Sequence, residues 1–151
     1  MSYGTYACTL IFPESAYNEE LKELVGPEAD YDNGIGFYDG VVTLGHSDCS
    51  EPGFEAIEAY LIQHKVAFDA YNEFLDGAEG SSYRYYRPQR EVCPKIDIQI
   101  PCERGGDIMI SVEKLNDLLS TTLSAEDIVA NIQRAIDAAN PFVPRLELYT
   151  N

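Results

Sequence analysis

The sequence has few cations for its length. Its 151 residues include 10 lysine and arginine residues against 26 aspartate and glutamate residues, a formal net charge of −16. A chain of this charge repels nucleic-acid phosphates and anionic membrane surfaces, so we expect neither as a direct partner. No apolar run approaches the roughly 18 residues of a membrane span. The first residues lack the basic region and cleavage site of a signal peptide, which favours a cytoplasmic protein.

Cysteine and histidine are also scarce. The four cysteines, Cys8, Cys49, Cys93 and Cys102, form no CxxC pair, which excludes a zinc ribbon and a thioredoxin-type site. The nearest approach to a metal motif is His46-Ser47-Asp48-Cys49. It would bind a metal only if Cys93 or Cys102 came close in space, and the sequence leaves that open.

The motifs of common enzyme sites are absent as well. The sequence contains no P-loop, no GxGxxG, no HExxH and no nucleophile elbow. His46 and His64 are the only imidazoles that could serve acid–base catalysis. We therefore assign no catalytic residue and expect no cofactor.

What remains predicts one α+β domain over residues 1–151, with a mainly antiparallel sheet of about five to seven strands. Apolar spacing predicts two helices in the first half, Ser15–Val25 and Glu51–His64, and a long helix near Ala125–Ala139. We expect all three helices to pack against the sheet.

Local signals place several of these elements. Residues Tyr3–Phe12 are rich in strand-forming residues, and Asp39-Gly40 between two apolar runs predicts a tight hairpin. Gly26-Pro27 is expected to end the first helix, whose outward glutamates are typical of a solvated surface. Ser124 with Asp127 resembles a capping box for the last helix.

The negative charge gathers in the first half, where residues 1–83 carry a net charge of −14 against −2 for residues 84–151. Glu51, Glu55 and Glu58 share one side of the second predicted helix. Together with acids of the neighbouring loop and hairpin, they would form one continuous, exposed negative surface. A second candidate surface is the strip Tyr83–Pro88, which interleaves tyrosines with Arg84 and Arg87. Its arginines would either face a partner or pair with carboxylates while the tyrosines cover the sheet.

These two surfaces supply the candidate partner-binding residues. They are Asp30, Asp32, Asp39, Asp48, Glu51, Glu55, Glu58, Tyr83, Arg84, Tyr86 and Arg87.

Four segments carry a resemblance to a group of proteins. They are Asp39–Leu44, Ser50–Ile62, Val66–Asp69 and Tyr86–Pro88. In this order they resemble small uncharacterised acidic proteins of bacterial plasmids and phages, in which a DG hairpin precedes a GxFxxLExxL helix, an IPFD-like strand and an RP end. The resemblance implies a mobile genetic element and no particular activity.

Three functions fit these observations. The first is a non-enzymatic protein whose carboxylates occupy the basic, nucleic-acid-binding site of a partner protein, as in a DNA-mimic inhibitor of host defence. The second is an immunity protein against a basic nuclease toxin. The third is a metal-dependent enzyme or sensor that uses the acidic loop Glu28–Asp39 with His46 and Asp48, although Asn33 stands where a calcium loop requires glycine. A homo-oligomer remains open.

Overall fold

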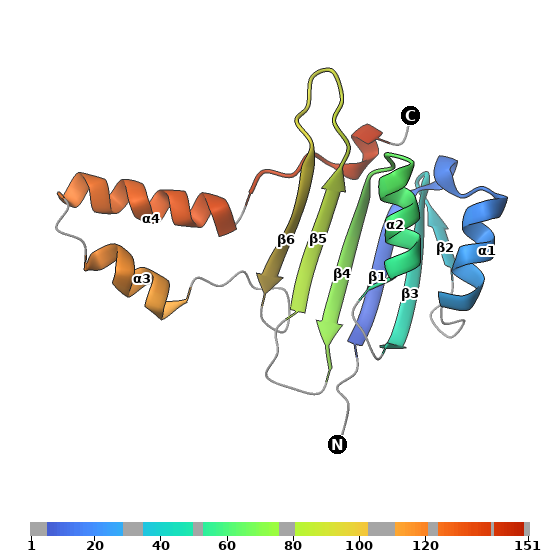
Figure 1. The fold of residues 1–151 in the computed structure, drawn as a ribbon, viewed down its shortest axis with the longest axis horizontal. Helices are drawn as coiled ribbons and strands as arrows, with labels where there is room; N and C mark the ends of the chain where they lie inside the picture. Colours follow the sequence, from blue (N-terminus) through green and yellow to red (C-terminus); the bar gives the residue numbers. More distant parts are fainter. Residues whose placement is uncertain are drawn as a thin grey trace.

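A computed structural model describes residues 6–28, 35–49, 53–75, 81–102, 111–120, 124–139 and 141–149 (Figure 1). Six strands form one sheet in the order β2-β3-β1-β4-β5-β6, and every neighbouring pair is antiparallel. The predicted α+β class with an antiparallel sheet is therefore confirmed.

The strands are β1 (Tyr6–Pro13), β2 (Ile35–Tyr38), β3 (Val41–Cys49), β4 (Phe68–Phe74), β5 (Ser81–Arg87) and β6 (Ile96–Cys102). The α-helices are α1 (Glu19–Glu28), α2 (Glu55–Gln63), α3 (Val112–Leu119) and α4 (Ala125–Ala139), and the 3₁₀ helices are η1 (Glu14–Ala16) and η2 (Leu146–Tyr149).

The hairpin between β2 and β3 forms at the predicted dipeptide. Asp39 and Gly40 both take positive φ values, 50° and 78°, and Tyr38 pairs with Val41. A two-residue hairpin turn of this kind needs left-handed backbone at both central positions, which aspartate tolerates and glycine prefers.

Helices α1 and α2 lie on one face of the sheet, and we call this the helix-covered face (Figure 1). Alternate residues of the strands point toward the helices and form the main core with apolar residues of α1 and α2. This core includes Leu10, Phe12, Val42, Leu44 and Phe68 of the sheet, Leu21 and Val25 of α1, and Ile57 and Leu61 of α2.

The first helix begins and ends later than predicted. The side-chain oxygen of Asn18 accepts a hydrogen bond from the backbone N–H of Leu21 at 2.9 Å, so Asn18 caps the helix. Ser15 instead lies in the 3₁₀ turn η1. The helix also continues through Gly26-Pro27 to Glu28. Pro27 falls in the last turn, where its missing N–H removes a hydrogen bond only at the end of the helix.

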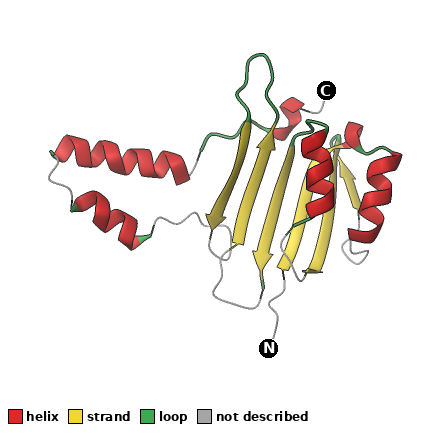
Figure 2. Ribbon diagram, viewed as in Figure 1, coloured by secondary structure: helices red, strands yellow, loops and turns green. Residues whose placement is uncertain are grey.

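Helix α4 does not pack against the sheet, contrary to our expectation. It packs against α3, and the two helices extend beyond the β6 side of the sheet (Figure 2). We call this pair the helical arm. The predicted start of α4 at Ser124 is confirmed, because the Ser124 hydroxyl accepts a hydrogen bond from the N–H of Asp127; the same hydroxyl donates one to the Asp127 carboxylate.

The physical reason lies in how residues 141–149, the C-terminal segment, are held. Leu146 and Tyr149 pack with Ala67 over Ile11 and Val41 on the sheet face opposite α1 and α2, which we call the open face. The chain that follows α4 must return to this position, so α4 cannot also occupy it.

Arg87 fixes the C-terminal segment from inside the molecule. The side chain is 2% exposed, its Nε donates to the carbonyl of Pro144 at 2.8 Å, and its Nη1 donates to the carbonyl of Phe68 at 2.8 Å. Its Nη2 lies 2.6 Å from the carboxylate of Asp69. Arg90 adds a second tie, through a 2.6 Å hydrogen bond to the carbonyl of Leu148.

Replacing Arg87 with methionine should lower the free energy of unfolding by about 3–5 kcal/mol, because the substitution leaves the half-buried Asp69 carboxylate and two carbonyls without their partner. Urea denaturation measures the loss. Arg134→Met, on the exposed side of α4, is the control and should change stability by less than about 0.5 kcal/mol. A loss below about 1 kcal/mol for Arg87→Met would contradict the role assigned to this residue.

Candidate protein-binding surface

The structure separates the acidic residues that the sequence grouped. Asp39 is exposed at the tip of the β2–β3 hairpin, and Glu55 is exposed at the first residue of α2. Asp48 lies near the other end of β3, about 23 Å along the strand from Val41 at roughly 3.3 Å per residue. Asp39 and Asp48 therefore do not belong to one compact surface. Asp30, Asp32 and Glu51 lie outside the described residues.

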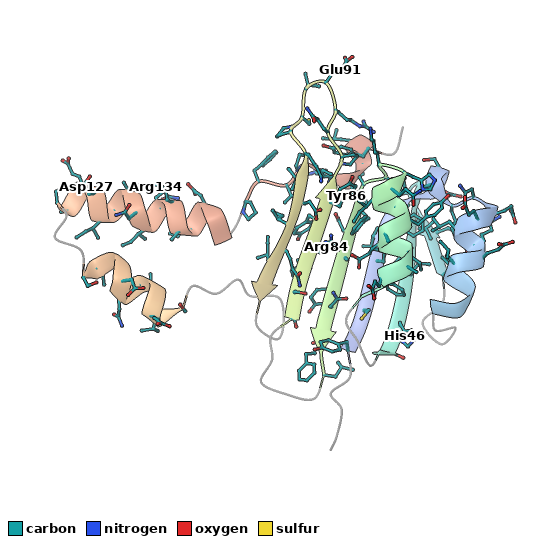
Figure 3. All side chains as sticks on the ribbon, viewed as in Figure 1. His46, Arg84, Tyr86, Glu91, Asp127 and Arg134 are labelled. Atoms are coloured by element: carbon teal, nitrogen blue, oxygen red, sulfur yellow. The ribbon has the colours of Figure 1, made fainter. Side chains whose placement is uncertain are left out.

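Glu58 is not on an exposed face, and that expectation is wrong. Its residue is 7% exposed, and its carboxylate accepts a hydrogen bond of 2.7 Å from Nη1 of Arg84 (Figure 3). Arg84 also donates to the carboxylate of Asp97 at 3.2 Å. Because Glu58 is removed from water between α2 and the sheet, burial raises its pKa, and the nearby Arg84 only partly opposes this effect.

The turn before α2 is built around the same carboxylate. Gly53 has a φ of 98°, and a Cβ at this position would lie 3.0 Å from Oε1 of Glu58. Both facts require glycine here. Its backbone N–H donates to the sulfur of Cys8 at 3.2 Å, which ties the turn to the central strand.

The strip on β5 is divided between the two faces of the sheet. Tyr83 and Tyr85 lie on the open face, where Tyr71 and Tyr83 stack with ring centroids 4.5 Å apart. Tyr86 is buried against Phe68 on the other face. Arg84 and Arg87 both pair with carboxylates, which is the second of the two arrangements expected from the sequence. Neither cation is therefore presented to a partner in this structure.

A cavity of about 590 Å³ lies between the open face and the C-terminal segment. Tyr83, Tyr85 and Ile100 line it from the sheet, and residues 143–147 line it from the other side. The donors of Arg87 beside it already bind Asp69 and backbone carbonyls. The cavity therefore offers no free cation from the sheet for an anionic ligand.

The residues of the possible metal site do not converge. Cys49 lies on β3 and Cys102 on β6, with three strands between them, which places their backbones about 19 Å apart. Cys93 lies in the loop after β5, near Glu91, at the end of the sheet opposite His46 (Figure 3). Within the described part of the chain, no group of three histidine, cysteine or acidic side chains could hold a metal ion.

A different acidic surface forms where η1 meets the β2–β3 hairpin. The backbone N–H of Glu14 donates to the carbonyl of Gly40 at 2.8 Å, which holds the turn against the hairpin tip. The turn, α1 and the hairpin tip carry five exposed acids, Glu14, Glu19, Glu20, Glu23 and Asp39, of which Glu20 accepts a hydrogen bond from the Tyr60 hydroxyl of α2 at 3.2 Å. Lys22 is the one cation in η1, α1, β2 and β3, and it pairs with Glu19 at 2.6 Å.

Two exposed aromatic side chains lie on β2, the strand at this edge of the sheet, and they point to opposite faces: Phe37 pairs with Val42 on the helix-covered face, and Tyr38 pairs with Val41 on the open face. Phe37 is 53% exposed and Tyr38 is 76% exposed, while the ring of Tyr17 contacts Phe37 at 5.5 Å between centroids. We call Phe37, Tyr38 and the five acids the acidic edge. The sequence did not indicate this surface, because the spacing of the α1 glutamates is that of an ordinary solvent-exposed helix face. The run Phe37-Tyr38-Asp39 at a hairpin tip was the available signal.

Comparison of the chain with protein-family models, with curated proteins and with solved structures finds no match. Among the described residues, no helix is long and apolar enough to cross a membrane.

The burial of Glu58 predicts a pH dependence of stability. Because its pKa is higher in the folded state than the unfolded value of 4.5, folding favours the protonated form, and this group reduces stability as pH rises from about 4.5 through the folded pKa. Glu58→Gln removes the effect. Its free energy of unfolding, measured in urea, should therefore rise relative to the wild type between pH 4 and pH 7.

Glu55→Gln is the matched control, since it removes one carboxylate from the exposed side of the same helix. For each variant, the quantity compared is its free energy of unfolding minus that of the wild type, as a function of pH. If this difference rises no more steeply with pH for Glu58→Gln than for Glu55→Gln, burial of the Glu58 charge does not limit stability.

Proposed function

We propose that this protein is a non-enzymatic binding protein whose acidic edge occupies a basic, nucleic-acid-binding site on a partner protein. The observation that carries the proposal is the exposure of Phe37 and Tyr38 on the two faces of the edge strand β2, next to η1, α1 and the hairpin tip, which carry five exposed acids and one cation. Exposed aromatic residues within a charged rim are the arrangement that protein interfaces use for their central contacts.

The charge density along α1 supports a basic site as the target. Glu19, Glu20 and Glu23 place three carboxylates within about 6 Å of helix axis, at 1.5 Å per residue. Duplex DNA carries one charge per about 1.7 Å, or three to four over the same length. Lys22 cancels one carboxylate of the helix. A lysine- and arginine-lined cleft that binds a phosphate backbone would therefore meet a field of the same sign, at about half the charge density of duplex DNA.

The two kinds of residue contribute differently to binding. An exposed ion pair is worth about 0–1 kcal/mol, so the acids mainly set the association rate and its dependence on salt. Burial of an aromatic side chain supplies more of the affinity, about 1.5–3 kcal/mol for full burial. Binding should therefore weaken with salt and should depend on Tyr38, the more exposed ring.

Capture from a bacterial lysate tests the proposal. Immobilised wild-type protein should retain a basic protein at about 50 mM salt and release it at high salt. Added duplex DNA should also release the captured protein, because DNA and the acidic edge compete for the same basic site. Glu14→Lys/Glu23→Lys should reduce capture at least about tenfold, and Tyr38→Ala should reduce it without changing the salt dependence.

The control variant Glu91→Lys/Glu113→Lys makes the same change in net charge at exposed positions outside the acidic edge. Equal loss of capture in both charge variants would assign the effect to net charge alone. Retention of the partner by Glu14→Lys/Glu23→Lys, or failure of duplex DNA to release it, would contradict the proposal.

A further inference from the structure

The helical arm exposes apolar side chains that its two helices do not bury. Val129 of α4 is 66% exposed and Ile136 is 42% exposed, and Val112 and Leu119 of α3 are exposed as well. Helices of 8 and 15 residues are marginal in water unless tertiary packing covers their apolar faces. Within the described residues, α3 and α4 pack mainly on each other, and the four exposed apolar side chains remain uncovered.

Three exposed residues of α4, Ala125, Val129 and Ile136, form a seam of defined spacing with the partly exposed Ile132. Ala125, Val129, Ile132 and Ile136 follow at intervals of four, three and four residues, the spacing of a helix-pairing stripe. Ile128 and Ala135, which are only partly exposed, lie beside this stripe. α4 is thus apolar over a wider arc than contact with a single helix, α3, can cover.

The charged residues of α4 stand away from the seam. At 100° per residue, its four charged side chains lie about 90° or more from the centre of the stripe. These residues are Glu126, Asp127, Arg134 and Asp137. In a chain of net charge −16, an acid-free stripe is a place where a second identical chain can approach with little repulsion.

The position of the arm favours the same occupant. The arm extends from the β6 side of the sheet, whereas α1 and the hairpin of β2 and β3 lie on the opposite side (Figure 1). Two chains joined through their arms keep their most acidic surfaces far apart. An unrelated basic partner would instead be drawn to those acidic surfaces.

We propose that two copies of this chain associate through their helical arms, with the α4 seams packed against each other in a four-helix arrangement. A two-fold contact of this kind is self-complementary, since the same stripe serves both copies. The number of residues in the arm approaches the 20–30 that each side of a standard interface contributes. Only one face of each helix is used, however, so the contact area is smaller than in a standard interface. The dimer is therefore expected in the micromolar range. This inference does not rest on the proposed function.

Sedimentation equilibrium of the full chain from about 2 to 200 μM tests the proposal. The average mass should rise with concentration from 16.8 kDa toward twice that value. Val129→Lys/Ile136→Lys should remain monomeric over the whole range, although added lysines reduce the repulsion between two acidic chains. The control Ala130→Lys/Asp137→Asn makes the same charge change on the polar side of α4 and should dimerise like the wild type.

Val129→Ala/Ile136→Ala separates lost contact from lost helix, because alanine has the highest helix propensity. It should keep the helical circular dichroism of the wild type and raise the dissociation constant at least tenfold. A wild-type chain that stays monomeric at 200 μM would overturn the proposal. So would a dimer that the lysine variant leaves intact. If the chain is monomeric and the amides of α3 and α4 are nevertheless protected from hydrogen exchange, the arm packs on the sheet of its own chain. That result would also overturn the proposal.

Discussion

The architecture of the second half of this protein depends on one buried cation. Arg87 has almost no contact with water, and its hydrogen bonds and ion pair reach three parts of the chain: the first residues of β4, its own strand β5 and the C-terminal segment. A buried charge is costly unless every donor has a partner, so the carbonyl of Pro144 and the carboxylate of Asp69 must both be in place. This requirement brings the C-terminal segment back onto the sheet. It also leaves the chain between β6 and that segment to form an arm of its own.

The sequence predicted the parts of the fold that local chemistry determines. Asp39-Gly40 predicted the hairpin because few residues tolerate two successive positive φ angles, and Ser124 with Asp127 predicted the start of α4 because the capping contact is only three residues long. The antiparallel sheet followed from alternating strands and tight turns. The position of α4 was predicted wrongly, since its apolar stripe shows that the helix needs a partner but not which one. That choice depends on Arg87 and Pro144, which are 57 residues apart.

The candidate site shows the same division between local and distant information. Glu51, Glu55 and Glu58 share a helix face by spacing, yet Glu58 turns inward because Arg84 stands opposite it on β5, 26 residues later. Helical periodicity cannot report the residue across the interface. Conversely, Glu14 and Asp39 come together through the pairing of β1 with β3, which ends at Pro13 and Val41, and through the hydrogen bond between η1 and the hairpin tip. Their shared surface was therefore invisible to an analysis of charge along the chain.

The order of the strands has a consequence for synthesis. The first strand of the chain, β1, lies inside the sheet between β3 and β4, so it must wait for both partners to leave the ribosome before its hydrogen bonds are complete. Arg87 waits longer still, because the carbonyl that accepts from its Nε belongs to Pro144, near the end of the chain. A nascent chain therefore has Asp69 and the carbonyl of Phe68 as partners for Arg87 before it has the acceptor for Nε, so the C-terminal segment can dock only after Pro144 has been translated.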